Sequence, residues 1–171
     1  DGTPTDAMIL ALNHVFKDFN PDFVFSGINA GSNVGDEISY SGTVGAAFES
    51  ALRGIPSAAL SQHSENNKLF NFDVAKKNLP NVIKELKKQN FENCFFNVNF
   101  PYCNTDEVKE IFFAQSSNQK LSDEIKINYN EMFFEIGKMI IREENKIIND
   151  ICALKKNYIT FTPIDINLTK R

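Results

Sequence analysis

The sequence lacks several features that would assign it to a functional class. It has no apolar run of about 18 or more residues, so we expect no membrane-spanning helix and no membrane partner. Acidic residues outnumber basic ones, and the formal net charge is −4. This balance argues against a nucleic-acid-binding protein, because such proteins present clustered basic surface.

Tryptophan is absent and cysteine is scarce. The three cysteines, Cys94, Cys103 and Cys152, do not have the spacing of a metal site, and one is left over if any two pair. Reduced cysteines in a cytoplasmic protein are the simplest interpretation. No signal peptide is visible, and the chain begins with Asp1 rather than Met.

Residues 23–56 are the most informative stretch that is present. An apolar run, Phe23 to Phe25, is followed by a loop rich in Gly, Ser and Asn and then by a helix of small residues. In α/β proteins such a loop lies at the carboxyl edge of the sheet, and the helix N-terminus binds anions. The helix is predicted to begin at Ser41, Gly42 and Thr43, where two hydroxyls and several backbone N–H groups would bind a phosphate.

The glycines of this loop, Gly27, Gly31 and Gly35, recur every four residues in GINAGSNVG. This spacing is neither the dinucleotide fingerprint nor the P-loop, because the G-x-G start and the terminal Gly-Lys-Ser/Thr are missing. One alternative is that the glycines only permit positive φ angles. The many polar side chains beside the helix start favour anion binding over this alternative. They are Ser26, Asn29, Ser32, Asn33, Ser39, Ser41 and Thr43.

Asn29 could offer its amide oxygen to a hard cation such as Mg²⁺ or Mn²⁺. One amide is too weak to hold such a metal. The nearest carboxylates, Asp36 and Glu37, either complete a site or form a solvated loop pair. The histidines, His14 and His63, have no partner in the sequence for a Ser-His-Asp or Cys-His arrangement.

Helices and strands alternate up to about residue 115. A capping box at Thr3 and Asp6 starts the first helix. Further helices are predicted over 43–53 and 72–89, the latter kinked or split at Pro80. Strands are predicted over 22–26, 57–61, 94–100 and 110–114. This order predicts a Rossmann-like α/β fold, with a mostly parallel sheet and flanking helices.

After Ser116 the pattern changes. Alternating apolar residues around 125–136 predict an antiparallel hairpin with Asn130-Glu131 in its turn. Strands over 158–163 and 165–168 are predicted to follow. We therefore expect one domain over residues 1–171, with an α/β core over 1–115 and a β-rich extension over 116–171. The exposed edges of such an extension commonly pair with another subunit or are shielded.

The sequence closely resembles the SurE family of metal-dependent phosphatases. The resemblance runs nearly end to end, and SGINAG followed by YSGTVGAA is its most specific part. The other matching pieces are GTPTDA at 2–7, GIPSAALS at 54–61, FNVNFP at 96–101, FFEIG at 133–137 and YITFTPIDINLT at 158–169.

The resemblance implies hydrolysis of nucleoside 5′- and 3′-monophosphates with a divalent metal, Mg²⁺ or Mn²⁺. Asn29 matches a metal ligand of the family, and Ser41, Gly42 and Thr43 match its phosphate-binding turn. Asn29, Ser41 and Thr43 are thus the candidate catalytic residues, with Gly27, Gly31 and Asn33 shaping the loop. The resemblance also implies a homodimer or homotetramer, and it removes Asp36 and Glu37 as metal ligands.

One departure from the family is clear. Family members begin with a strand ending in Asn-Asp-Asp-Gly, whose aspartates hold the metal, and a later serine completes the site. This sequence has no Asp-Asp pair. We therefore expect the chain to be a fragment that lacks segments at both ends, and these 171 residues alone to be inactive.

Two other functions stay open at this point. The chain could be a non-catalytic module that binds phosphate or joins subunits. A nucleotide-cofactor oxidoreductase is a weaker alternative, because the G-x-G-x-x-G fingerprint is missing.

Overall fold

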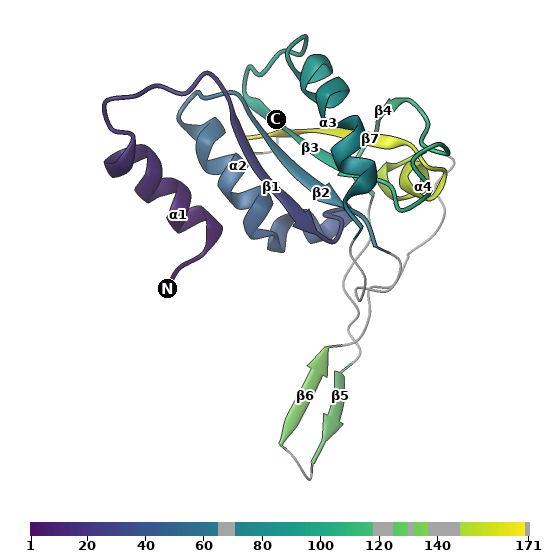
Figure 1. Cartoon of the computed structure of the whole chain (residues 1–171). Coiled ribbons are helices and arrows are strands. Elements are labelled where there is room, and N and C mark those ends of the chain that lie inside the picture. The colour runs from purple at the N-terminus through teal and green to yellow at the C-terminus, as the bar shows by residue number, and fades with distance from the viewer. Residues whose placement is uncertain (65–70, 118–124, 130–131, 137–147, 170–171) are drawn as a thin grey trace.

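The computed structural model describes residues 1–64, 71–117, 125–129, 132–136 and 148–169. Figure 1 shows a main sheet with helices on both faces and a small hairpin that stands apart from it. Among the described residues, no helix is long and apolar enough to cross a membrane.

The main sheet has five strands in the order β1-β2-β3-β7-β4. These strands are β1 (Val24–Ala30), β2 (Ser57–Gln62), β3 (Cys94–Phe100), β7 (Ile159–Asp165) and β4 (Ile111–Phe113). The β1–β2, β2–β3 and β4–β7 pairings are parallel, and β3 pairs with β7 in the antiparallel sense. The predicted α/β class with a mostly parallel sheet is confirmed.

The described residues form four α-helices: α1 (Pro4–Leu10), α2 (Gly42–Leu52), α3 (Asp73–Leu86) and α4 (Asp150–Lys155). Alternate residues of the strands face opposite sides. Phe96 and Val98 of β3 face the core beneath α3, whereas Phe95 packs against Val44 and Ala47 of α2. The sheet is therefore buried on both faces, as a parallel sheet requires.

Helix α1 lies on the outside of α2 (Figure 1). Its predicted capping box is present, because Thr3 Oγ1 accepts from the N–H of Asp6 and the Asp6 carboxylate accepts from the N–H of Thr3. The start of α1 approaches α2 closely. A Cβ added to Gly42 would lie 2.8 Å from Cδ and Cγ of Pro4. Glycine at position 42 thus lets the two helices touch where α2 begins.

Several predicted elements differ from the structure. Strand β1 runs on to Ala30, so Gly27 and Asn29 lie within the strand rather than in the loop; the register with β2 shifts between Ser26 and Asn29. Helix α3 continues through Pro80 as one helix, since its buried face packs on the sheet on both sides of that proline. Residues 166–169 form no separate strand.

Two helical segments were not predicted. A 3₁₀ helix, η2, spans Gly35–Tyr40, and α4 lies inside the part expected to be β-rich. Asn149 caps α4, because its Oδ1 accepts from the N–H of Cys152 at 2.9 Å. Helix α4 has only 6 residues, which is too short for a helical period to be recognised in the sequence.

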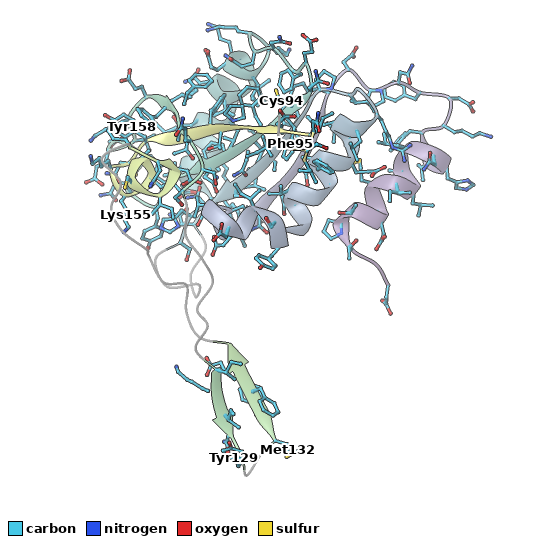
Figure 2. All side chains as sticks on the ribbon, turned by 180° about the vertical axis from the view of Figure 1, so that it is seen from behind. Cys94, Phe95, Tyr129, Met132, Lys155 and Tyr158 are labelled. Carbon is cyan, nitrogen blue, oxygen red and sulfur yellow. The ribbon has the colours of Figure 1, made fainter. Side chains whose placement is uncertain are left out.

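The predicted hairpin is present as β5 (Ile125–Asn128) paired antiparallel with β6 (Phe133–Ile136). The predicted turn at Asn130-Glu131 lies outside the described residues. Figure 2 shows Tyr129 and Met132 at the tip of the hairpin, away from the side chains of the main sheet, and both are 79% exposed.

Candidate functional site

The carboxyl ends of β1, β2 and β3 lie at one edge of the sheet, and α2 begins at the same edge (Figure 1). Helix α2 must start there because it runs back along the sheet to the beginning of β2. The predicted phosphate-binding residues, Ser41 to Thr43, therefore lie on the same edge as Asn29. This is the place where open α/β sheets bind ligands.

The turn at Ser41 begins α2 as predicted. The Oγ of Ser41 accepts from the N–H of Val44 at 3.2 Å, which makes Ser41 the N-cap and leaves its own O–H available to donate. α-Helix geometry gives the N–H groups of Gly42 and Thr43 no intrahelical acceptor. Ser41, Gly42 and Thr43 are all partly exposed. An anion can reach this turn.

Asn29 lies near the end of β1, opposite Ser61 of β2. Its Nδ2 donates to the carbonyl of Gly31 at 2.8 Å. This bond fixes which end of the amide carries the donor and leaves Oδ1 as the free acceptor end. The Asn29 side chain is thus held by the loop after β1, and it is partly exposed.

The loop after β1 is anchored by Asn33, which is 5% exposed. Its N–H donates to Oδ1 of Asn99 at 2.8 Å, and its Nδ2 donates to Oγ of Ser61 at 2.6 Å. Its carbonyl accepts from Nδ2 of Asn97 at 2.7 Å and of Asn99 at 3.1 Å. The two asparagines of FNVNF therefore hold the loop against β3, a role that the sequence pattern did not reveal.

The model of the family "Survival protein SurE" matches residues 1–123 of this sequence. The chain belongs to the SurE family. The relatives named 5′-nucleotidase SurE from Paramagnetospirillum magneticum and Campylobacter lari are each 38% identical to it. The chain is covered to 100% and 99% in these alignments, and it spans 67% and 68% of the two relatives.

A solved structure agrees with this assignment. The crystal structure of SurE protein from Aquifex aeolicus is similar to this chain with a TM-score of 0.80 and 31% identity. The similarity covers 99% of this chain and 69% of the Aquifex chain. The family predicted from SGINAG and YSGTVGAA is thus confirmed, together with its fold.

Two acidic residues that the sequence pattern did not connect, Asp150 and Glu37, contact the loop before the phosphate turn in this SurE-family chain. Asp150, at the start of α4, is fully buried, and its Oδ2 accepts from the N–H of Gly35 at 2.9 Å. Burial raises the pKa of the Asp150 carboxyl, and the N–H groups that bind it act in the opposite direction. No motif marked Asp150, which is 115 residues from Gly35.

Glu37, in η2, lies near Asp150. Burial is the main cause that raises the pKa of Glu37, and the nearby charge of Asp150 raises it further. Its Oε2 is 3.5 Å from the N–H of Val34. Glu37 therefore packs into the loop, as a structural acid rather than an outward-facing ligand.

His63, for which the sequence offered no partner, has one in the structure. Its Nδ1 lies 3.1 Å from Oγ of Ser32, in the loop after β1. The two residues come from the ends of neighbouring strands, β1 and β2, so only the sheet topology brings them together.

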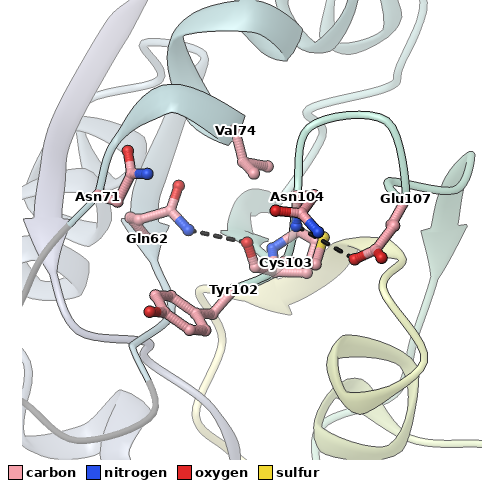
Figure 3. Close-up of a pocket in the computed structure, with 8 residues that line it drawn as sticks. Gln62, Asn71, Val74, Tyr102, Cys103, Asn104 and Glu107 are labelled. Atoms are coloured by element: carbon pink, nitrogen blue, oxygen red, sulfur yellow. Dashed lines mark hydrogen bonds between the residues drawn. The ribbon is translucent and has the colours of Figure 1, made fainter.

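A cavity of about 260 Å³ lies at the same edge of the sheet but on the α3 side (Figure 3). Gln62 forms one wall, because its Nε2 donates to the carbonyl of Pro101 at 2.9 Å and its Oε1 accepts from the N–H of Ala75 at 3.2 Å. None of the site residues predicted from the sequence lines it. The lining residues are Gln62, Asn71, Val74, Pro101, Tyr102, Cys103, Asn104 and Glu107.

The described residues do not make a complete metal site. They contain no group of three or more His, Cys, Asp or Glu side chains that could hold a metal ion. Asn29 offers one amide oxygen, whereas Mg²⁺ is bound through carboxylates as well. A metal at this edge would need ligands other than those of the described residues.

Proposed function

We propose that this protein hydrolyses the phosphate ester of nucleoside 5′-monophosphates, with nucleoside 3′-monophosphates and short polyphosphate as further substrates. The observation that carries the proposal is the partly exposed start of α2, Ser41 to Thr43, at the same sheet edge as Asn29. The relatives that match the whole chain are named 5′-nucleotidases, which supports this substrate class.

Ser41, Gly42 and Thr43 bind the phosphate in this proposal. The N–H groups of Gly42 and Thr43 and the hydroxyls of Ser41 and Thr43 donate to its oxygens, and the positive end of the α2 dipole favours its charge. Donors fixed in this way also stabilise the charge that develops during transfer, because they need no reorganisation at that moment. Asn33 keeps the preceding loop in place through β3.

A divalent cation, Mg²⁺ or Mn²⁺, belongs to the proposal. Such a cation polarises a phosphoryl oxygen and lowers the pKa of a bound water when it is present. Asn29 would contribute its Oδ1, while its Nδ2 stays on the carbonyl of Gly31. The described residues do not supply the remaining ligands, so the roles assigned here are those of binding and orientation.

We also propose a cytoplasmic homodimer or homotetramer. The three cysteines are free, which fits a reducing compartment. Phe133 and Phe134 of the hairpin are 56% and 63% exposed. Exposed apolar side chains on a short hairpin are suited to contact with another subunit.

A second candidate is a module that binds phosphate without catalysis. It is favoured by one observation, the absence of a carboxylate cluster beside Asn29 among the described residues. The two candidates share the phosphate site and differ only in turnover.

The experiment that separates them is phosphate release from a panel of nucleoside monophosphates by the complete gene product, with Mn²⁺, with Mg²⁺ and with EDTA. We expect release that requires a divalent metal and falls at least 10²-fold in Asn29→Ala. Asn81→Ala, an exposed asparagine on α3, is the matched control and should behave as wild type. A folded protein that binds phosphate but releases no phosphate from any nucleotide, with any metal, would support the non-catalytic module instead.

A further inference from the structure

Asp150 joins three segments that are far apart in the sequence. Its Oδ2 accepts from the N–H of Gly35, and its Oδ1 accepts from the N–H groups of Ser117 and Ile151, each at 2.9 Å. Gly35 belongs to the loop before the phosphate turn, and Ser117 follows β4. One buried carboxylate thus satisfies three backbone donors at once.

Apolar and polar contacts strengthen the same junction. Val34 packs with Ile151 and Leu154 of α4 in a small buried cluster. The carbonyl of Gly35 also accepts a hydrogen bond from Oγ of Ser116, at 3.5 Å. Both backbone polar groups of Gly35 are therefore held by residues from the C-terminal half of the chain.

A single short helical segment connects the junction to the phosphate turn. The 3₁₀ helix η2 begins at Gly35 and ends at Tyr40, directly before Ser41. Ile38, in the middle of η2, packs against the core beneath α2. Because η2 is a continuous helical segment whose middle packs on the core, we expect a displacement of Gly35 to shift Ser41 as well.

We propose that Asp150 is a positioning residue for the phosphate turn, which it orients by fixing Gly35 at the start of η2. The inference rests on the proposed role of Ser41 to Thr43 in binding phosphate, and it adds a residue from α4 that does not touch the ligand. A change of about 1 Å in such a group can cost about 10²-fold in rate, so the contact bears on function as well as on stability.

Asp150→Asn is the most selective test. An amide has one acceptor oxygen. If that oxygen stays with Ser117 and Ile151, the NH₂ group faces the N–H of Gly35, and two donors then oppose each other. The variant thus removes the contact to the loop while α4 keeps its own. Asp73→Asn is the matched control, because Asp73 is also the first residue of a helix, α3, but is exposed, and its carboxylate forms an ion pair with the exposed Lys76 at 3.8 Å.

The measurements use the complete gene product at a temperature well below its unfolding midpoint. We expect Asp150→Asn to raise the KM for a nucleoside 5′-monophosphate and the dissociation constant of inorganic phosphate, measured by direct binding, by the same factor, about 10- to 100-fold. Amide hydrogen exchange should become faster over residues 35–41. Asp73→Asn should leave all three quantities unchanged.

A purely structural role predicts a different pattern. Asp150→Asn would then lower the unfolding midpoint while phosphate bound with wild-type affinity, and that result would overturn the inference. If Asp150→Asn does not fold, the same measurements are made on Val34→Ala. This variant loosens the same loop without burying an unpaired polar group. Binding of inorganic phosphate is measured without turnover, so a protein that binds phosphate but hydrolyses no nucleotide refutes the proposed activity and still tests Asp150.

Discussion

Asn99 holds the backbone of Asn33 in the way that a neighbouring strand would. Its Oδ1 accepts from the N–H of Asn33 at 2.8 Å, and its Nδ2 donates to the carbonyl of the same residue at 3.1 Å. The loop after β1 is thus tied to β3 by a side chain 66 residues away. This pairing fixes the loop between Asn29 and the phosphate turn.

Asn99→Ala tests the cost of that pairing. The substitution leaves the buried N–H of Asn33 without an acceptor, and an unsatisfied buried donor costs about 1–3 kcal/mol. We expect the free energy of unfolding in urea to fall by about that amount. Asn81→Ala, on the exposed face of α3, should stay within about 0.5 kcal/mol of wild type. Equal stability of the two variants would show that the Asn33 contact is not formed.

Gly42→Ala tests the contact between α1 and the start of α2. The added methyl would lie 2.8 Å from Cδ and Cγ of Pro4, and overpacking of this kind costs about 1–3 kcal/mol. Pro4→Ala removes both of these atoms, so the double variant should regain most of the stability that Gly42→Ala loses. Thermal unfolding of the two single variants and the double variant gives the coupling. Additive losses would contradict the predicted clash.

Glu37→Gln tests the buried carboxyl beside Asp150. Burial raises the pKa of Glu37, so the folded state binds more protons than the unfolded state. This difference begins near the ordinary glutamate pKa of about 4.3 and extends above it. Through this window the contribution of Glu37 to stability falls as pH rises. The destabilisation caused by burying the charged Glu37 carboxylate is present in full at pH values above the raised pKa.

The expected outcome for Glu37→Gln is therefore a higher unfolding midpoint than wild type at pH 7. The difference should disappear at pH values below about 4, where both side chains are neutral. Glu110→Gln, at an exposed position, should show no such pH-dependent gain. A variant that is less stable than wild type at pH 7 would show that the charge of Glu37 is stabilised rather than penalised.

Local patterns in the sequence predicted much of the fold. The capping residues Thr3 and Asp6 predicted the first helix, and Ser41 before Gly42 predicted the start of α2. Both predictions were possible because capping residues act within one helical turn. The alternation of strands and helices was enough for a mostly parallel sheet. The family was predicted from GINAG and YSGTVG together, since both the residues and their spacing are specific.

The elements and contacts that were missed depend on distant partners. Helix α4 is short, and its apolar residues Ile151 and Leu154 pack against Val34, which is distant in the sequence. Strand β1 continues past Gly27 because β2 pairs with Asn29 and Ala30 after a shift in register, which no local pattern reports. Asp150 acts through Gly35, and His63 contacts Ser32, so neither could be assigned before the topology was known.

The proposed function depends on phosphate binding at the start of α2. The most direct measurement is a titration of ¹⁵N-labelled protein with inorganic phosphate, followed in amide ¹H–¹⁵N spectra. We expect the Gly42 and Thr43 resonances to shift most and to reach saturation, and we expect Thr43→Val to weaken the binding. Shifts confined to residues lining the Gln62 cavity, or no shift at Gly42 and Thr43 at saturating phosphate, would contradict this expectation.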